Sequence, residues 1–124
     1  MHKYIILFFS VTLILSACKQ DETPPNIIKR DKMVNLLTDL HILDGNMYNI
    51  AQVPDSIQKY GTNGYLALFK RYHTDSAQFR RSYKYYTTQP FEFQAMYDQI
   101  LDNLTRKTDS LRKRQYRQKN ASPL

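Results

Sequence analysis

Apolar residues recur every three or four positions along most of the chain after residue 30, which is the spacing of one face of an α-helix. Four stretches show this spacing, and none shows the strict alternation of a half-buried β-strand. The pattern therefore predicts an all-α fold, a small helical bundle of three short helices and one long C-terminal helix.

The first two stretches predict two separate helices. The first helix is expected to begin near Asp31, whose carboxylate can accept free backbone N–H groups, and to fade between residues 49 and 51. The second is expected over residues 54–72. Gly61 and Gly64 could form a turn there, but the apolar spacing continues across both glycines, so we favour a single helix. Small residues at these positions would let another helix approach closely.

The other two stretches predict a short helix capped by Thr74 or Asp75 and a long helix that begins at Pro90. Proline suits the first turn of a helix because its missing N–H has no helical partner to lose there. The long helix could run to about Arg117. Its last part has few apolar residues, so it is expected to project beyond the core and fray, with residues 120–124 disordered.

The N-terminus has the pattern of a secretory signal, with a basic start, an apolar run over residues 4–15 and small residues after it. The run is too short for a membrane-spanning helix, which needs about 20 apolar residues. The sequence Leu15-Ser16-Ala17-Cys18 resembles the lipobox of bacterial lipoproteins. In that family the Cys thiol receives a diacylglycerol and the chain is cut just before it. The resemblance implies a signal peptide over residues 1–17 and lipid attachment at Cys18, with a spanning anchor or a free thiol as alternatives.

The sequence Lys19-Gln20-Asp21-Glu22 resembles the acidic export tag of Bacteroidetes surface lipoproteins, although Gln20 interrupts the pattern. A solvated tether is the alternative. We expect an acylated Cys and flexible tether over residues 18–28, a helical domain over 29–111, and a basic helix end with a disordered tail over 112–124. The expected location is the cell envelope, as an outer membrane lipoprotein that faces either the periplasm or the cell surface.

The formal charge of +7 is concentrated in the last helix. Residues 106–119 hold seven basic residues against Asp109 alone, whereas residues 18–105 carry ten basic and ten acidic residues. Nucleic acid is a poor partner for an exported protein. Anionic lipid headgroups, the phosphates of lipopolysaccharide or an acidic protein fit this tail better, and a solvated helix end without a partner is the simpler alternative.

Several short runs resemble, in their order and spacing, the Bacteroidetes lipoproteins grouped as domain of unknown function 4296. They are residues 27–34, 39–44, 65–72 and 79–86, and Gln89-Pro90 before the last helix. The resemblance covers about residues 24–110. It implies a helical fold and lipoprotein status, and it supplies no catalytic residue because the family has no established activity.

Asp39, His41 and Asp44 form the most suggestive cluster for chemistry. His41 and Asp44 are three positions apart and share a helix face, where they could orient each other or bind a metal. Asp39 would point away, and a stable metal site needs more ligands than these. We therefore expect a half-buried histidine, hydrogen-bonded at a helix interface, with no metal or cofactor. A hydrolase or metal-dependent enzyme built on His41 is the alternative.

Eight tyrosines form a second candidate group, and most of them fall on faces that are predicted to enter the core. They are Tyr48, Tyr60, Tyr65, Tyr72, Tyr83, Tyr85, Tyr86 and Tyr97. Tyr85 is an exception, because it lies off the face that Phe79, Tyr83 and Tyr86 share. An aromatic ring with a hydroxyl group can grip a partner, so Tyr85 is a candidate interaction residue.

Three Asp-Ser-apolar tripeptides resemble O-glycosylation sites of Bacteroidetes, which makes Ser56, Ser76 and Ser110 candidates for modification. For the first two, ordinary helix capping by the preceding aspartate is the alternative. The third lies within the predicted last helix, where capping does not explain it.

The chain lacks a Gly-rich phosphate loop, a Cys/His metal spacing and a Gly-x-Ser-x-Gly motif. The sequence thus favours a non-enzymatic lipoprotein that binds another envelope protein through the region of Tyr85, the basic last helix, or both. A glycan- or lipopolysaccharide-binding module is the first alternative, and a hydrolase built on His41 is the second.

Overall fold

The computed structural model describes residues 23–48 and 54–121 of the 124-residue chain. All the regular secondary structure in these two ranges is helical, and the last helix is long, so the predicted all-α architecture is confirmed. The elements are α2 (Arg30–Met47), α3 (Pro54–Ser56), a π-helical segment η2 (Ile57–Thr62), α4 (Asn63–Arg71), α5 (Ser76–Thr87) and α6 (Pro90–Ala121).

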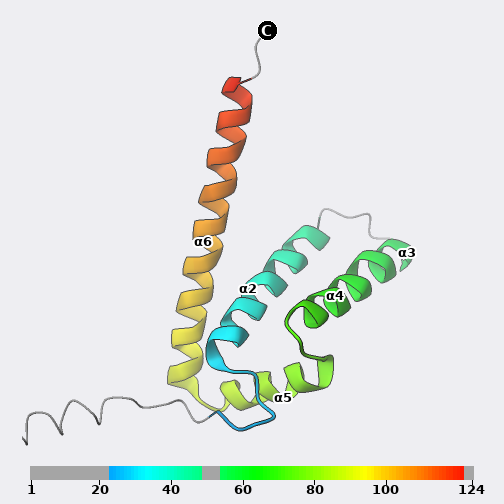
Figure 1. Ribbon diagram of the computed structural model, residues 1–124, viewed down its shortest axis with the longest axis vertical. Coiled ribbons are helices and arrows are strands. Elements are labelled where there is room, and N and C mark those ends of the chain that lie inside the picture. The colour runs from blue at the N-terminus through cyan, green and yellow to red at the C-terminus, as the bar shows by residue number, and fades with distance from the viewer. Residues whose placement is uncertain (1–22, 49–53, 122–124) are drawn as a thin grey trace, which may run out of the picture.

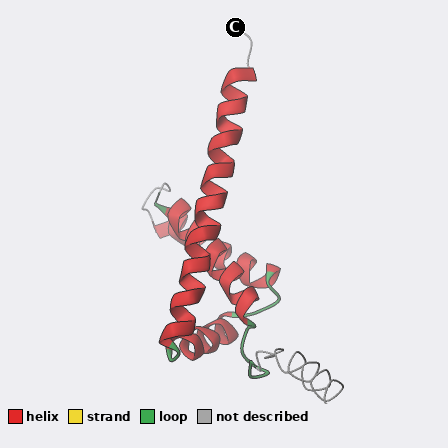
Figure 2. Cartoon of the chain, turned by 90° about the vertical axis from the view of Figure 1, so that its left-hand side faces the viewer, coloured by secondary structure: helices red, strands yellow, loops and turns green. Residues whose placement is uncertain are grey.

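Helix α2 lies in the middle of the bundle (Figure 1). Helix α6 packs along one side of it and α4 along the other, while α5 crosses the end of the bundle at which α2 and α6 begin. The second half of α6 extends beyond the other helices (Figure 2). No helix among the described residues is both long enough and apolar enough to cross a membrane.

The core is formed where α2 meets the other helices. Met33, Leu36, Met96 and Ile100 are fully buried there, and burying one such side chain stabilises the fold by about 1.5–3 kcal/mol. The segment before α2 also enters this core. Ile28 is 2% exposed, its N–H donates to Ser82 Oγ at 2.8 Å and its carbonyl accepts from the Tyr86 hydroxyl at 2.8 Å.

The start of α2 differs from the prediction. Lys29 occupies the N-cap position and provides no side-chain cap, whereas Asp31 lies inside the first turn with its side chain 94% exposed. The expectation that Asp31 caps the helix is therefore wrong. Its carboxylate still lies near the positive end of the helix dipole, which favours a negative charge. The predicted fading at residues 49–51 lies outside the described ranges.

The second stretch is one helix from Pro54 to Arg71, as we favoured, with a π-helical segment in its middle. The glycines make no turn. A Cβ on Gly61 would lie 2.8 Å from Met47 Cε, and a Cβ on Gly64 would lie 2.9 Å from Leu43 Cδ1. Both glycines therefore allow the close approach of α2 that their position in the sequence suggested.

The ends of the last two helices follow local chemistry. The Asp75 carboxylate caps α5 by accepting from the Gln78 N–H at 2.7 Å, and Pro90 is the first residue of α6. Helix α6 continues to Ala121, past the expected end at Arg117, so the expectation of disorder is wrong for residues 120 and 121. Residues 122–124 are not described.

Candidate functional site

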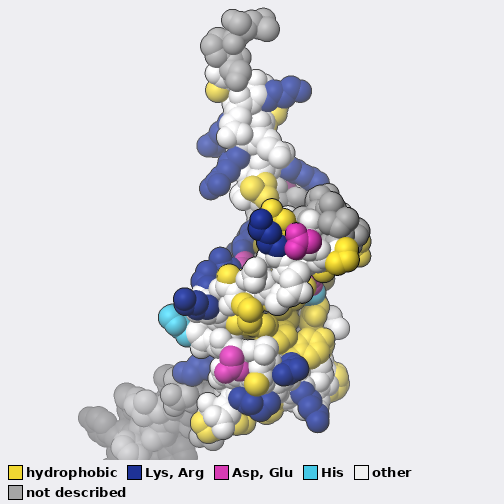
Figure 3. All heavy atoms as spheres, turned by 90° about the vertical axis from the view of Figure 1, so that its right-hand side faces the viewer, with side chains coloured by type: hydrophobic (Ala, Val, Ile, Leu, Met, Phe, Trp, Pro, Cys, Tyr) yellow, Lys and Arg dark blue, Asp and Glu magenta, His cyan; other side chains and the backbone are white. Residues whose placement is uncertain are grey.

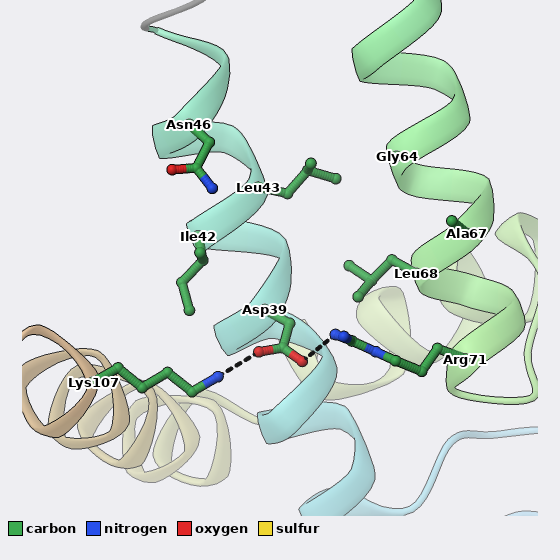
Figure 4. Close-up of a pocket in the computed structure, with 9 residues that line it drawn as sticks. All are labelled: Asp39, Ile42, Leu43, Asn46, Gly64, Ala67, Leu68, Arg71 and Lys107. Carbon is green, nitrogen blue, oxygen red and sulfur yellow. Dashed lines mark hydrogen bonds and ion pairs between the residues drawn. The ribbon is translucent and has the colours of Figure 1, made fainter. Parts of the chain in front are cut away.

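Asp39 stands at the centre of a polar cluster that joins three parts of the bundle. Its carboxylate accepts from Lys107 Nζ of α6 at 2.6 Å, from Arg71 Nη2 at the end of α4 at 2.5 Å and from the Tyr72 hydroxyl at 2.7 Å. Lys107 and Arg71 reach the carboxylate from opposite sides (Figure 4). We call these four residues the Asp39 cluster.

The electrostatics of this cluster keep Asp39 ionised. Burial alone would raise the pKa of its carboxyl, but the hydrogen bonds from Lys107 and Tyr72 and the charges of Lys107 and Arg71 lower that pKa below its ordinary value. Burial and the Asp39 carboxylate raise the pKa of Tyr72 to about 12. At neutral pH the cluster therefore holds two cations, one carboxylate and a neutral phenol, and carries one net positive charge.

Two open grooves flank the cluster. The first, which we call the α2–α4 groove, has a volume of about 440 Å³ and combines apolar side chains with the charged groups of Asp39, Arg71 and Lys107. Its remaining lining residues are Ile42, Leu43, Asn46, Gly64, Ala67 and Leu68. The second groove, of about 390 Å³, lies between α2 and α6 and is lined by residues with polar or charged side-chain groups. Its lining residues outside the cluster are Asn35, Thr38, Asn103, Arg106 and Ser110.

In the structure, Asp39, His41 and Asp44 each contact different neighbours. The ring of His41 meets the edge of Tyr97 on α6, with ring centroids 5.9 Å apart. Asp44 accepts from the Tyr65 hydroxyl instead. His41 is half-buried at a helix interface, as expected, but its Nε2 is buried and has no hydrogen-bond partner among the described residues. The expected hydrogen bond at this atom is therefore absent, because the neighbour that the bundle provides is an aromatic ring.

A metal site does not emerge from the described part of the chain. No group of three or more His, Cys, Asp and Glu side chains there could hold a metal ion. His41 and Asp44 contact different neighbours, so they do not form a ligand pair.

Tyr85, the candidate interaction residue, does not stand clear of the core. Tyr85 is partly buried, packs against the core and meets the edge of Tyr86 at 5.2 Å between ring centroids. Tyr83, which the pattern assigned to the core face, is 38% exposed. Helix α5 thus contacts the segment before α2 through Tyr86 and α6 through Tyr83, so its contacts extend beyond the single face that the spacing predicted.

The three candidate serines lie in different settings. Ser56 is half-buried at the end of α3, Ser76 is exposed as the first residue of α5, and Ser110 is exposed within α6. Ser110 Oγ donates to the carbonyl of Lys107 at 2.8 Å. The capping alternative holds for Asp75, and modification of the serines stays a prediction.

The segment Thr108–Ala121, which we call the free half of α6, is exposed at every residue. It carries five basic residues against Asp109. Its two large apolar side chains are also open to solvent, Leu111 at 56% and Tyr116 at 70%. Lys and Arg side chains project from this segment near the top of Figure 3.

The chain enters the bundle at the end opposite the free half of α6. Ile28 is fixed to α5 by Ser82 and Tyr86, and α6 begins directly after α5 (Figure 1). The predicted lipid site at Cys18 and the signal residues Leu15, Ser16 and Ala17 lie outside the described residues.

Sequence reasoning expected Asp39 to point away from His41 and missed its partners. Arg71, Tyr72 and Lys107 lie 32, 33 and 68 residues further along the chain. No local spacing connects such positions, and the only signal was a carboxylate close to an apolar stripe.

The family model of a domain of unknown function, DUF4296, matches residues 24–110, which include the Asp39 cluster and both grooves. Searches of the curated proteins and of the solved structures gave no match. The match covers well over half of the chain. The chain therefore belongs to the DUF4296 family, which indicates no activity.

Proposed function

We propose that this protein is a lipoprotein of the cell envelope, anchored in the outer membrane through Cys18, and that it acts as a non-enzymatic interaction module. Its partner would be an acidic envelope protein. The observation that carries this proposal is the free half of α6, a helix that continues past the core with every residue exposed.

The free half of α6 is a helical segment that packs against no other helix of the bundle among the described residues, so its stability needs an explanation. Residues 108–121 extend about 20 Å at 1.5 Å per residue, and isolated helices shorter than about 12–15 residues are marginal in water. The docked first half of α6 supplies the nucleus from which this segment continues. A partner that lies along the segment would supply the packing that the bundle does not.

The side chains of the free half suit a protein partner with acidic groups. Five basic residues against one acidic residue attract such a surface and speed its encounter. Leu111 and Tyr116 offer apolar contact among these charges, and tyrosine is among the residues that contribute most to binding energy at interfaces.

The position of the anchor favours a protein over the headgroups of the same membrane. The first nine residues of the expected tether, 18–26, can span at most about 30 Å. The chain then joins the bundle beside α5, far from the free half of α6. A lipid at Cys18 would thus keep the α5 end within about 30 Å of the membrane, whereas it sets no such limit on the free half of α6, which can extend further out to meet a protein.

The test compares two variants that lose the same charge from different places. In one, Arg112, Lys113, Arg114 and Arg117 are replaced by Gln. In the control, Lys70, Arg80, Arg81 and Lys84, which are exposed on α4 and α5, are replaced by Gln. Each variant carries an affinity tag, is expressed in its native cells in place of the wild-type chain, and is cross-linked before the envelope is extracted.

The proposal predicts that a defined acidic protein is recovered with the wild-type chain and with the control, and that recovery with the first variant falls about tenfold, a loss typical of an electrostatic interface. Raising the salt concentration before the cross-linking step should weaken recovery with the wild-type chain. Equal recovery with both variants would contradict the proposal.

A further inference from the structure

We propose that the α2–α4 groove binds a small amphiphilic anion, with a carboxylate head at the Asp39 cluster and an unbranched apolar chain along the groove. This site is separate from the free half of α6, so the proposal does not depend on a protein partner. The observation behind it is that one open groove joins unused cationic donors to an apolar wall.

At the charged end of the groove, Arg71 and Lys107 have hydrogen-bond donors that Asp39 does not use. Arg71 gives one Nη2 contact and Lys107 one Nζ contact to Asp39, whereas a guanidinium carries five N–H groups and an ammonium carries three. Both cationic side chains are accessible, at 63% and 51% exposure. A second carboxylate would neutralise the excess positive charge of the cluster and would complete an arrangement of two cations and two anions.

The apolar wall comes from both helices. Leu43 of α2 and Leu68 of α4 point into the space between the two helices (Figure 4), and Ile42 and Ala67 extend this surface. Gly64 lets Leu43 lie directly against α4 at this wall, because a Cβ there would lie 2.9 Å from Leu43 Cδ1. An apolar chain bound beside these residues would be transferred from water to a largely hydrocarbon surface.

The dimensions indicate how large the ligand is. Asp39 and Asn46 lie at the two ends of the groove on α2, about 10 Å apart at 1.5 Å per residue. An octanoate chain has about this length. The volume of about 440 Å³ lies within the range of small-molecule sites. A free phosphate would contact the cations but leave the apolar wall uncovered.

The experiment is a titration of the full ¹⁵N-labelled chain, followed by NMR chemical shifts, with hexanoate, octanoate, octanol and inorganic phosphate as separate probes. We expect octanoate to shift the amides of Leu43, Gly64 and Ala67, and to bind more tightly than hexanoate by about fourfold for each added methylene. Octanol should bind at least about tenfold more weakly, because it lacks the charged head.

Paired variants locate the site. Ala67→Glu places a negative charge on the wall and should abolish octanoate binding, whereas Ala77→Glu, at an exposed position on α5, should leave it unchanged. Lys107→Met should weaken binding about tenfold, whereas Lys113→Met in the free half of α6 should not affect it. Because Ala67 is exposed, its variant keeps the fold and tests the site even where loss of Lys107 disturbs the bundle.

Four results would overturn the proposal. The first is the absence of amide shifts in the groove with octanoate, and the second is equal binding of octanol and octanoate. The third is octanoate binding that survives Ala67→Glu. Binding of inorganic phosphate alone would leave the cations as a simple anion site and would likewise reject the amphiphile.

Discussion

Asp39 and Lys107 form an ion pair of 2.6 Å across 68 residues of sequence, and this contact ties the middle of α2 to α6 just before the free half begins. Arg71 and Tyr72 bind the same carboxylate from the end of α4. One half-buried side chain therefore fixes the position of two neighbouring helices relative to α2.

Replacing this carboxylate tests its contribution to stability. We expect Asp39→Asn to lower the free energy of unfolding by about 1–2 kcal/mol, because it removes charged hydrogen bonds to partly exposed cations. The measurement is urea unfolding near pH 7. Asp109→Asn, at an exposed position on α6, should change the stability by less than about 0.5 kcal/mol.

The stability that Asp39 contributes should depend on pH. The folded state lowers the pKa of Asp39 below its ordinary 3.8, so its contribution is fully present above that value and is lost as the pH falls through the lower folded-state pKa. The wild-type chain should lose stability more steeply than Asp39→Asn below about pH 4. Parallel curves for the two proteins would contradict the assigned direction of the shift.

We predict that Ser82 holds the segment before α2, which we call the entry segment, in its place against α5. It is fully buried, and its Oγ accepts from the Ile28 N–H and donates to the carbonyl of Gln78. Ser82→Ala should cost about 1–3 kcal/mol in thermal or urea unfolding, because it leaves a buried N–H without a partner. Thr87→Ala, which removes an exposed hydroxyl on the same helix, is the control and should be nearly neutral.

Gly45 and Gly64 should respond differently to replacement by alanine. Gly45 is exposed within α2 and a Cβ there meets nothing within 4 Å, so Gly45→Ala should stabilise the protein by about 1 kcal/mol. Gly64→Ala should gain clearly less, because its Cβ forces Leu43 to move. Equal gains in melting experiments would show that the close approach of α2 and α4 has no energetic consequence.

His73 follows the end of α4 with φ of 48°, a backbone conformation that favours glycine. Its N–H bonds to the carbonyl of Lys70 and the N–H of Thr74 bonds to that of Phe69, which is the pattern of a Schellman cap. His73→Gly should therefore raise the free energy of unfolding by about 1 kcal/mol. His73→Ala keeps the strain and should show no gain.

The lipid prediction is tested at Cys18, the single cysteine of the chain. Cys18→Ser should abolish incorporation of an alkyne-labelled fatty acid and move the protein out of the membrane fraction, since a hydroxyl does not replace the thiol. Lys19→Ala keeps the thiol and should behave as the wild-type chain does. Membrane recovery of Cys18→Ser equal to that of the wild-type chain would reject the anchor.

Local chemistry allowed much of the fold to be predicted. The cap at Asp75, the start at Pro90 and the close packing at Gly64 each depend on residues within a few positions or on one helix face. The environment of Tyr85 could not be predicted in this way. Helical spacing identifies one buried face, whereas α5 contacts both the entry segment and α6.

The candidate site was harder to predict than the fold. Asp39 and His41 were found as chemistry-bearing residues, but their partners are set by how α2 packs against its neighbours. Lys107 binds the Asp39 carboxylate from across the bundle, and the ring of Tyr97 packs against the ring of His41. Both contacts join residues that only the tertiary fold brings together.

The two hydrogen bonds at Ile28 have a mechanical consequence. They bind the N–H and the carbonyl of one residue to neighbouring positions on α5. A pulling force on the N-terminus would therefore load both bonds together, before it reached the first turn of α2. Ile28 would act as a clamp that separates tension in the tether from the helices that carry the groove.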